Sequence, residues 1–239
     1  MNRETLEALV SDGEVLREQD LSGASLDGAR VGGGVFIQCS LRGARMAGLW
    51  AREALFIECD LSGADLTGAD LSHAQLQGCA MEGATLRDAD LTDTNLIGCA
   101  WRQVDAAGVT MRATMFVRGA VEGVSLVRAT LDRTVFTECA VRGLDLTEAS
   151  MPQTVLAQAD LTTATLTGAR LTRVVLVGSK LTGLDLRGIT LAGTQFTDCE
   201  MSRVDLRGCD VAGCNFKDAT LHEARLDEAH GAHALFVGA

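Results

Sequence analysis

The feature that most constrains the fold is an apolar residue at every fifth position from Leu16 to Leu226, 43 positions in succession. We call this position i. The residue at i−2 is nearly always small, as in the run Ala64, Ala69 and Ala74, and position i+2 holds 22 of the 26 glycines. In a chain that is 47% apolar, chance would give such a series about once in 10¹⁴. The chain is therefore built from repeated units of five residues.

A period of five fits neither a straight helix nor a straight strand. A helix with 3.6 residues per turn would spread the apolar residues around its axis. In an extended segment, positions i−2 and i point to the same side, but the next apolar-side residue, i+3, would point away. The chain must therefore turn a corner once in each pentad. Glycine at i+2 suits this corner because it tolerates a positive φ angle.

The spacing of phenylalanine and cysteine predicts how many corners close one coil. All seven phenylalanines are separated by multiples of twenty residues: Phe36, Phe56, Phe116, Phe136, Phe196, Phe216 and Phe236. Six of the eight cysteines share a second register of twenty: Cys39, Cys59, Cys79, Cys99, Cys139 and Cys199. Four pentads therefore make one coil.

The pentads resemble those of the pentapeptide-repeat proteins, whose pattern is A-(D/N)-L-x-x. The segments 64–68, 69–73 and 89–93 match this pattern in full. The resemblance extends over roughly nine-tenths of the chain. It implies an all-β fold, a right-handed quadrilateral β-helix of about ten to eleven coils. With a rise of about 4.8 Å per coil, the rod would be roughly 50 Å long.

The register divides the chain into three parts. We expect an N-terminal cap over residues 1–15, in which residues 2–10 form a short amphipathic helix with Asn2 at its N-cap. Residues 16–230 form the pentapeptide-repeat solenoid, and residues 231–239 form a C-terminal tail or cap. No insertion breaks the register between Leu16 and Leu226. We therefore expect no loop long enough to serve as an active-site lid.

Charge and hydropathy exclude several classes of function. The net charge of −11 argues against direct binding of nucleic acid. The charge is concentrated in residues 1–100, which carry 16 acidic and 7 basic residues, whereas residues 101–200 carry 10 of each. The first fifteen residues lack the basic and apolar segments of an export signal, and the apolar runs are too short to span a membrane. We expect a cytoplasmic protein without a membrane partner.

The residue types that commonly carry catalysis fall on packing positions. All eight cysteines lie at i−2 and none at CxxC spacing, so we interpret them as reduced packing residues in preference to disulfides or metal ligands. The four histidines form no recognisable catalytic or ligand set. Five threonines repeat in one register at i−2, where small side chains line the wall: Thr94, Thr114, Thr134, Thr154 and Thr194. We predict that the protein is not an enzyme and binds no cofactor or metal.

The first candidate functional surface is an apolar stripe on the outside of the face that bears the phenylalanines. Its residues occupy i−1 and i+1: Val35, Ile37, Leu55, Ile57, Ile97, Met115, Val117, Val135, Val155, Val175 and Val177. Such a stripe indicates an interface with a protein partner or within a homodimer. The alternative is that this face is the most strand-like, so that β-branched residues are favoured on it whatever they contact.

The second candidate surface is acidic. Pentapeptide-repeat proteins that protect against quinolones or related toxins bind DNA gyrase, and their rods resemble duplex DNA in width and charge. The resemblance implies nine acids as mimics of phosphates: Asp60, Asp65, Asp70, Asp90, Asp93, Asp105, Asp145, Asp185 and Asp205. The alternative is that aspartate at i−1 is simply the family pattern. The neutral middle third of the chain, with residues such as Arg112 and Arg118, favours this alternative.

Together these features predict a non-catalytic scaffold that binds a protein partner through its solenoid faces. The identity of the partner is left open. The alternative is a DNA-mimicking binder of gyrase or another topoisomerase, of the quinolone- or toxin-resistance type. The family resemblance alone adds a third interpretation, an accessory protein of a bacterial type VI secretion system, because residues 9–23 resemble the opening segments of that group.

Overall fold

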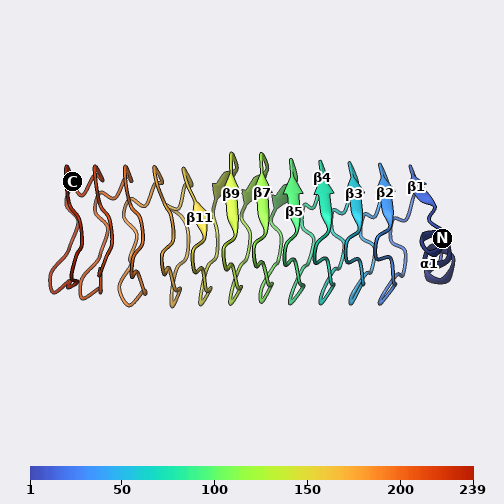
Figure 1. Cartoon of the computed structure of the whole chain (residues 1–239), viewed down its shortest axis with the longest axis horizontal. Coiled ribbons are helices and arrows are strands. Elements are labelled where there is room, and N and C mark those ends of the chain that lie inside the picture. The colour runs from blue at the N-terminus through green and yellow to red at the C-terminus, as the bar shows by residue number, and fades with distance from the viewer.

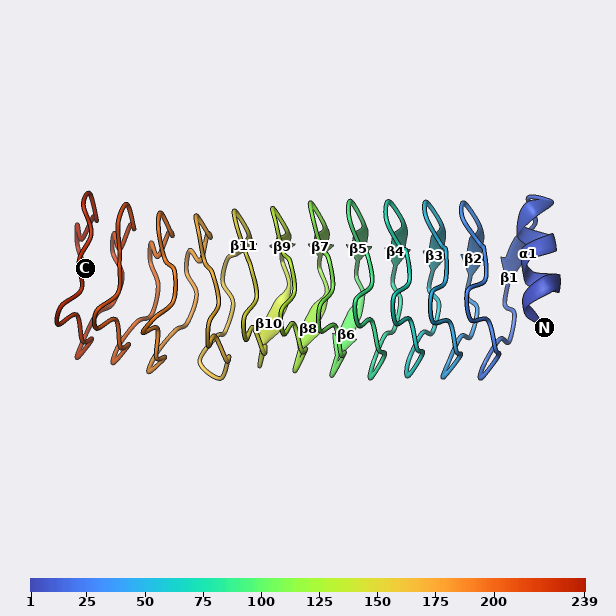
Figure 2. The ribbon, with the colours of Figure 1, turned by 90° about the horizontal axis from the view of Figure 1, so that it is seen from below.

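The computed structural model describes all residues, 1–239, and shows a straight four-sided solenoid with one helix. The chain advances coil by coil along the rod (Figure 1). Helix α1 (Arg3–Ser11) lies across the N-terminal end, and the C-terminus lies at the opposite end (Figure 2). The all-β solenoid implied by the resemblance to pentapeptide-repeat proteins is confirmed.

Two parallel sheets run along the rod. The larger sheet contains β1 (Val15–Arg17), β2 (Val35–Ile37), β3 (Leu55–Ile57), β4 (Gln75–Gln77), β5 (Asn95–Ile97), β7 (Met115–Val117), β9 (Val135–Thr137) and β11 (Val155–Leu156). The smaller sheet contains β6 (Ala100–Arg102), β8 (Ala120–Glu122) and β10 (Ala140–Arg142). Neighbouring strands pair in parallel between residues twenty apart, as in Phe36 with Phe56, so four pentads do form one coil.

The larger sheet forms what we call the Phe face, which comprises its strands and their continuation toward the C-terminus. This continuation is a series of parallel bridges that joins Val155 to Val175, Gln195, Asn215 and Leu235 in turn. The smaller sheet lies on the next face along the chain, which we call the charged face. The strands of the Phe face lie in one row along the rod (Figure 1).

Most corners are tight turns centred on i+1 and i+2, whereas those that follow strands such as β2 and β3 bend without the closing hydrogen bond. At a typical corner the N–H of Ala24 donates to the carbonyl oxygen of Leu21 at 3.0 Å, and the residue at i+2, Gly23, has a φ of 63°. This is the geometry of a type II turn. Residues other than glycine adopt the same positive φ at i+2, as in Asp93 at 56°. Thr163 is the one i+2 residue of the solenoid without a positive φ, because this conformation is strongly disfavoured for a β-branched side chain.

The hydrogen-bond ladder is interrupted one pentad after Thr163. In regular coils the N–H of residue i donates to the next coil, as Leu146 does to Thr165, and the N–H of i−1 donates to the preceding coil, as Asp205 does to Leu184. Leu166 and Asp185, which occupy the equivalent places between these coils, make no such bonds. A second interruption of the same kind lies further along the rod, where Leu191 and Asp210 make no such bonds. The coils are therefore held less tightly at these two places than where the ladder is regular.

We expect amide hydrogen exchange to locate this interruption. The N–H groups of Leu166 and Asp185 should exchange at least about ten times faster than those of Leu146 and Asp205, because they lack a partner in the adjoining coil. Exchange followed by NMR or by mass spectrometry of short fragments measures the difference. Equal protection across residues 144–205 would contradict it.

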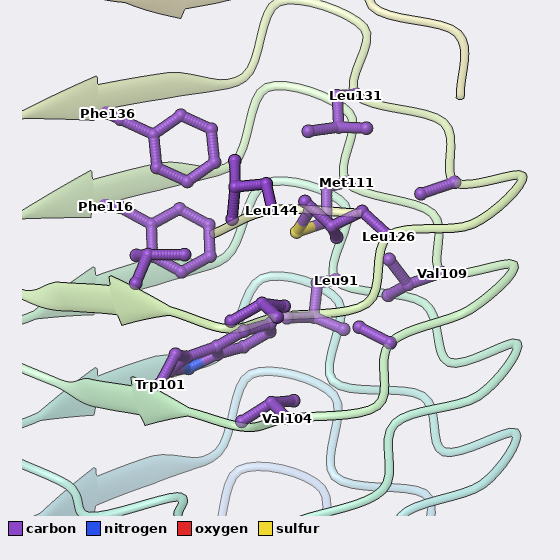
Figure 3. Packing of buried hydrophobic residues seen from close by; sticks show 14 of the residues in the cluster. Leu91, Trp101, Val104, Val109, Met111, Phe116, Leu126, Leu131, Phe136 and Leu144 are labelled. Carbon is purple, nitrogen blue, oxygen red and sulfur yellow. The ribbon is translucent and has the colours of Figure 1, made fainter. Parts of the chain in front are cut away.

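The i side chains fill the interior of the rod. Phenylalanine rings from successive coils stack, with centroids 4.8 Å apart for Phe36 and Phe56 and 4.6 Å for Phe116 and Phe136. Trp101 meets Phe116 edge-on at 5.1 Å (Figure 3). Ala106, the small i residue that follows Trp101, is fully buried. Large and small residues thus alternate so that the interior is filled.

The two ends of the rod differ. At the N-terminus, Asn2 accepts a hydrogen bond from the N–H of Thr5 at 2.9 Å, and Leu6 is 1% exposed, so the predicted capping helix is present. At the C-terminus, residues 231–239 continue the coil, and the ring of Phe236 stacks on that of Phe216 at 4.8 Å. No element covers this end, and Phe236 is 43% exposed. The structure contains no helix with the length and hydrophobicity needed to cross a membrane.

Candidate functional site

The Phe face combines apolar side chains with a complete absence of charge on its flat part. Between Val35 and Thr197 it presents eighteen outward side chains at i−1 and i+1, and none is Asp, Glu, Lys, Arg or His. All the residues predicted as a partner interface lie here. Most are partly exposed because each packs between its neighbours in the adjoining coils, whereas Met115 is 44% exposed. Only polar amides and threonines interrupt the apolar side chains, among them Gln75, Gln77 and Asn95.

The charged face has the opposite character, and the sequence analysis missed it. From Asp20 to Glu200 it carries one charged outward side chain in each coil. Several pair across coils: Arg42 Nη1 with Asp60 Oδ2 at 3.1 Å, Arg142 Nη2 with Glu122 Oε2 at 2.8 Å, and Lys180 Nζ with Glu200 Oε1 at 3.8 Å. Reading the outward positions at a spacing of twenty would have revealed this series. Because these charges largely neutralise one another, the face is solvated without a strong field of one sign.

The nine predicted DNA-mimic acids do not share one face. Asp60 lies on the charged face. Asp70 and Asp90 lie at i−1 on the fourth face, which precedes the Phe face along each coil, and Asp93 lies at i+2 on the edge between these two faces. Five lie at i−1 on the face opposite the Phe face, which we call the aspartate face: Asp65, Asp105, Asp145, Asp185 and Asp205.

Most of these carboxylates hold the corners of the solenoid. Eight of the nine accept a hydrogen bond from the backbone N–H two residues later, and Asp93 is the exception. The N–H of Thr67 donates to Asp65 Oδ1 at 3.0 Å, for example. An aspartate that bonds its own backbone in this way stabilises a turn. The family pattern of aspartate at i−1 therefore has a structural cause.

Arginines neutralise part of the aspartate face. Arg87 Nη2 lies 2.6 Å from Asp105 Oδ2, and Arg207 Nη2 lies 2.7 Å from Asp205 Oδ2. The hydrogen bonds from Arg207 hold the pKa of Asp205 well below its ordinary value. Those from the side chain and backbone of Thr67 lower the pKa of Asp65. Both carboxylates are therefore ionised in the folded protein and already engaged by it.

We expect the fold to lose stability in acid. A carboxylate whose pKa is lowered in the folded state stabilises the fold above the pKa of the unfolded chain, about 3.9, and this contribution is lost as the pH falls through the lower folded-state pKa. The melting temperature should therefore drop below about pH 4, and the drop should be smaller in Asp65→Asn. Thermal unfolding followed by circular dichroism at stepped pH measures both.

The control for the acid prediction is Asp93→Asn. Asp93 is the one candidate acid that accepts no hydrogen bond from the backbone N–H two residues later. Its substitution should leave the drop in melting temperature below about pH 4 unchanged. A melting temperature that stays level between pH 5 and pH 2 would contradict the prediction.

The buried thiols and hydroxyls are engaged by the backbone. Cys39 Sγ donates to the carbonyl oxygen of Leu16 at 3.4 Å, and Thr114 Oγ1 donates to that of Leu91 at 2.7 Å. All eight cysteines are free thiols. Burial raises the pKa of Cys199 and of Cys214 to about 11, so both thiols are protonated at neutral pH. No group of three or more His, Cys, Asp or Glu side chains is arranged to hold a metal ion.

The strands and faces define a parallel β-solenoid whose interior is filled by side chains. The sequence matches the family described as pentapeptide repeats, in eight copies, over residues 20–56, 52–88, 84–118, 142–178, 175–213 and 199–230. The chain therefore belongs to the pentapeptide-repeat family, as the residue pattern predicted. No curated protein sequence matches the chain.

Among solved structures, that of one pentapeptide-repeat protein, HetL, shows the same fold. The chain is similar to HetL, involved in heterocyst differentiation regulation in the cyanobacterium Nostoc sp. strain PCC 7120, with 23% identity, a TM-score of 0.58 and coverage of 100% of this chain and 99% of HetL. A trypsin-treated form of QnrB1, a plasmid-mediated fluoroquinolone resistance protein, gives 17% identity, a TM-score of 0.38 and coverage of 79% and 90%. A pentapeptide-repeat protein of the Arabidopsis thaliana thylakoid lumen is 24% identical, with a TM-score of 0.29 and coverage of 48% of this chain and 70% of that protein.

Proposed function

We propose that this protein is a non-catalytic scaffold that binds a protein partner through the Phe face. One observation carries the proposal: eighteen successive outward positions from Val35 to Thr197 bear no charge, although charged side chains occur in most coils of the other three faces. An uncharged and largely apolar surface of this length on a water-exposed rod is typical of an interaction site.

The shape of the surface indicates the kind of partner. Parallel strands lie along the Phe face in one row and no inserted loop interrupts them, so the backbone of this face is flat (Figure 1). Small molecules bind in concave pockets that enclose most of their surface. A flat apolar face is suited instead to a second protein surface, which can cover many residues at once.

The aspartate face supports the alternative, mimicry of DNA for gyrase binding, less well. Eight of the nine acids accept a backbone hydrogen bond, and several are paired with arginine, so few charges are free for a basic partner. We expect no inhibition of gyrase supercoiling by micromolar protein, with or without a quinolone. Inhibition that is lost in the double variant Asp65→Lys with Asp105→Lys would instead establish mimicry.

Site-specific photo-crosslinking in the native cells tests the proposed function. A photoreactive amino acid at Val117 lies at the centre of the Phe face, and one at Thr67, on the aspartate face, is the matched control. The proposal predicts protein adducts from Val117 that Thr67 does not give. Absence of adducts from Val117, or the same adducts from both positions, would exclude the Phe face as the interaction surface.

A further inference from the structure

We infer that the partner which the Phe face fits is a second copy of this chain, packed face to face and antiparallel about a twofold axis at β7. This inference rests on the proposed function and names its partner. It follows from the symmetry of the face, the charges along its edges, and the area that the face offers.

The uncharged part of the face is symmetric about β7. It begins at β2 and ends at residues 195–197, so that four coils lie on each side of β7. Met115 in β7 is the most exposed of the candidate interface residues, at 44%. An isologous dimer requires a surface that is complementary to itself when it is rotated by half a turn. An axis at β7 would place Leu55 and Ile57 opposite Val175 and Val177 of the second copy, and Met115 opposite its own counterpart.

The edge of the Phe face that precedes the strands along the chain changes from negative to positive charge at the same coil. Its acids and arginines at i+2 are Glu53 and Asp93 before β7, and Arg133 and Arg173 after β7. All four are exposed, and the ion pairs that three of them make within the chain are long, at 3.5–3.9 Å. Glu53 and Arg173 lie three coils from the β7 coil in opposite directions, whereas Asp93 and Arg133 lie one coil from it. In the antiparallel dimer, each acid therefore meets an arginine of the second copy.

The opposite edge is consistent with the same axis. It carries Arg118 in the coil of β7 and Glu138 in the next coil. In the dimer, Arg118 would face its own counterpart across the axis, and one Glu138 from each chain, one coil away, would balance the two positive charges. A parallel arrangement would instead join opposite edges at equal height, where the repulsive pair of Glu53 with Glu58 offsets the attractive pair of Arg133 with Glu138. The charges therefore favour the antiparallel arrangement.

The area of the face is sufficient for a specific dimer. Nine coils at a spacing of about 4.8 Å give a length of about 38 Å, and five residues at about 3.3 Å give a width of about 17 Å. The face would bury about 650 Å² on each copy, or about 1,300 Å² in total. Specific protein interfaces bury roughly 1,200–2,000 Å². The dimer would therefore be at the lower end of this class and depend on concentration.

Sedimentation velocity of the purified full chain between about 1 and 100 µM tests the inference. The wild type should form dimers, and Met115→Asp should raise the dissociation constant at least about 100-fold, because the axis brings two buried charges together. Val127→Asp, the same kind of change on the aspartate face, is the matched control and should leave the dimer intact. Circular dichroism of both variants confirms that the solenoid is folded.

A charge exchange tests the orientation. The variant Arg133→Glu with Arg173→Glu makes all four edge residues acidic, and Glu53→Arg with Asp93→Arg makes them all basic. Each variant alone should be monomeric, and an equimolar mixture should form heterodimers. A dimer that neither variant weakens, or a mixture that stays monomeric, would overturn the antiparallel arrangement.

Failure of this inference is distinct from failure of the proposed function. If the wild type is monomeric at every concentration but Val117 crosslinks to another protein, the second copy is excluded and the scaffold function is supported. If the wild type is monomeric and Val117 gives no adduct, both are excluded. Adducts between two copies of the chain, lost in Met115→Asp, would support both.

Discussion

Trp101→Ala is expected to lower the free energy of unfolding by about 3–5 kcal/mol, whereas Trp101→Phe should cost less than about 2 kcal/mol. Trp101 is 1% exposed, fills the rod between adjoining coils and meets the edge of Phe116 at 5.1 Å (Figure 3). Truncation to alanine would leave a cavity beside Ala106, which is itself too small to fill the space. The walls of a solenoid are closed by hydrogen bonds between coils, so they cannot collapse far into such a cavity.

The smaller cost of phenylalanine has a specific cause. The indole Nε1–H of Trp101 is the one buried side-chain polar group in the structure without a hydrogen-bond partner. Leaving such a donor unpaired costs about 1–3 kcal/mol. Phenylalanine keeps most of the volume and removes the unpaired donor, so the gain offsets part of the lost packing.

Urea unfolding followed by far-ultraviolet circular dichroism measures both variants of Trp101. Val121→Ala, one coil further on the same face, is the control for a simple loss of buried volume. A free energy of unfolding for Trp101→Phe as low as that for Trp101→Ala would contradict the role assigned to the unpaired N–H.

The backbone of this protein was largely predictable because its determinants are local and repeated. A corner once in five residues follows from the apolar series and from glycine at i+2, and the spacing of twenty follows from Phe36, Phe56 and their equivalents. Asn2 identified the start of α1 because an amide at this place accepts from the first free N–H groups of a helix. These features require no knowledge of side-chain conformation.

The candidate surfaces were predictable only in part. The composition of the Phe face could be read from the sequence, because outward positions follow from the register. The engagement of Asp65 by Thr67 and of Asp105 by Arg87 depends on side-chain conformation across a corner or between coils, which the sequence does not specify. The interruption near Leu166 was likewise missed, although a β-branched residue at i+2, Thr163, marks it.

The faces of the rod differ in what their outward side chains contact. Charges on the charged face pair between coils, and aspartates on the aspartate face hold corners, so both are occupied with the fold itself. The flat part of the Phe face has no charges to pair, and its outward side chains do not contribute to the interior. This difference is why the Phe face is the best candidate for recognition, and why its edges, where charges return, can select the partner's orientation.

Leu6→Asp is expected to open the N-terminal end of the rod and cause end-to-end polymerisation. Leu6 is the buried residue of α1, and it lies against Leu26, Val31 and Phe36 in the interior of the first coil. A carboxylate there would have no partner, so the helix should leave the end of the rod. The N–H and C=O groups of the first coil would then form an uncovered strand edge, which pairs readily with other strands.

The uncovered C-terminal end supplies the complementary edge. Leu235 and Val237 are 53% and 65% exposed, and no element covers this last coil. Contact between the N-terminal end of one rod and the C-terminal end of the next is heterologous and does not close, so it propagates as a filament. In the wild type, α1 covers the N-terminal end of the rod, where this contact would form (Figure 2).

Hydrogen exchange measures the release of α1, and light scattering measures polymerisation. Both are carried out in the Met115→Asp variant, so that dimerisation through the Phe face does not contribute. Leu6→Asp should lose protection over residues 14–37 and scatter light increasingly with concentration. Ala8→Asp introduces the same charge on the exposed side of α1 and should do neither. If Leu6→Asp stays monomeric and keeps its protection, α1 is not what covers the end, and the asymmetry between the two ends of the rod has no role in solubility.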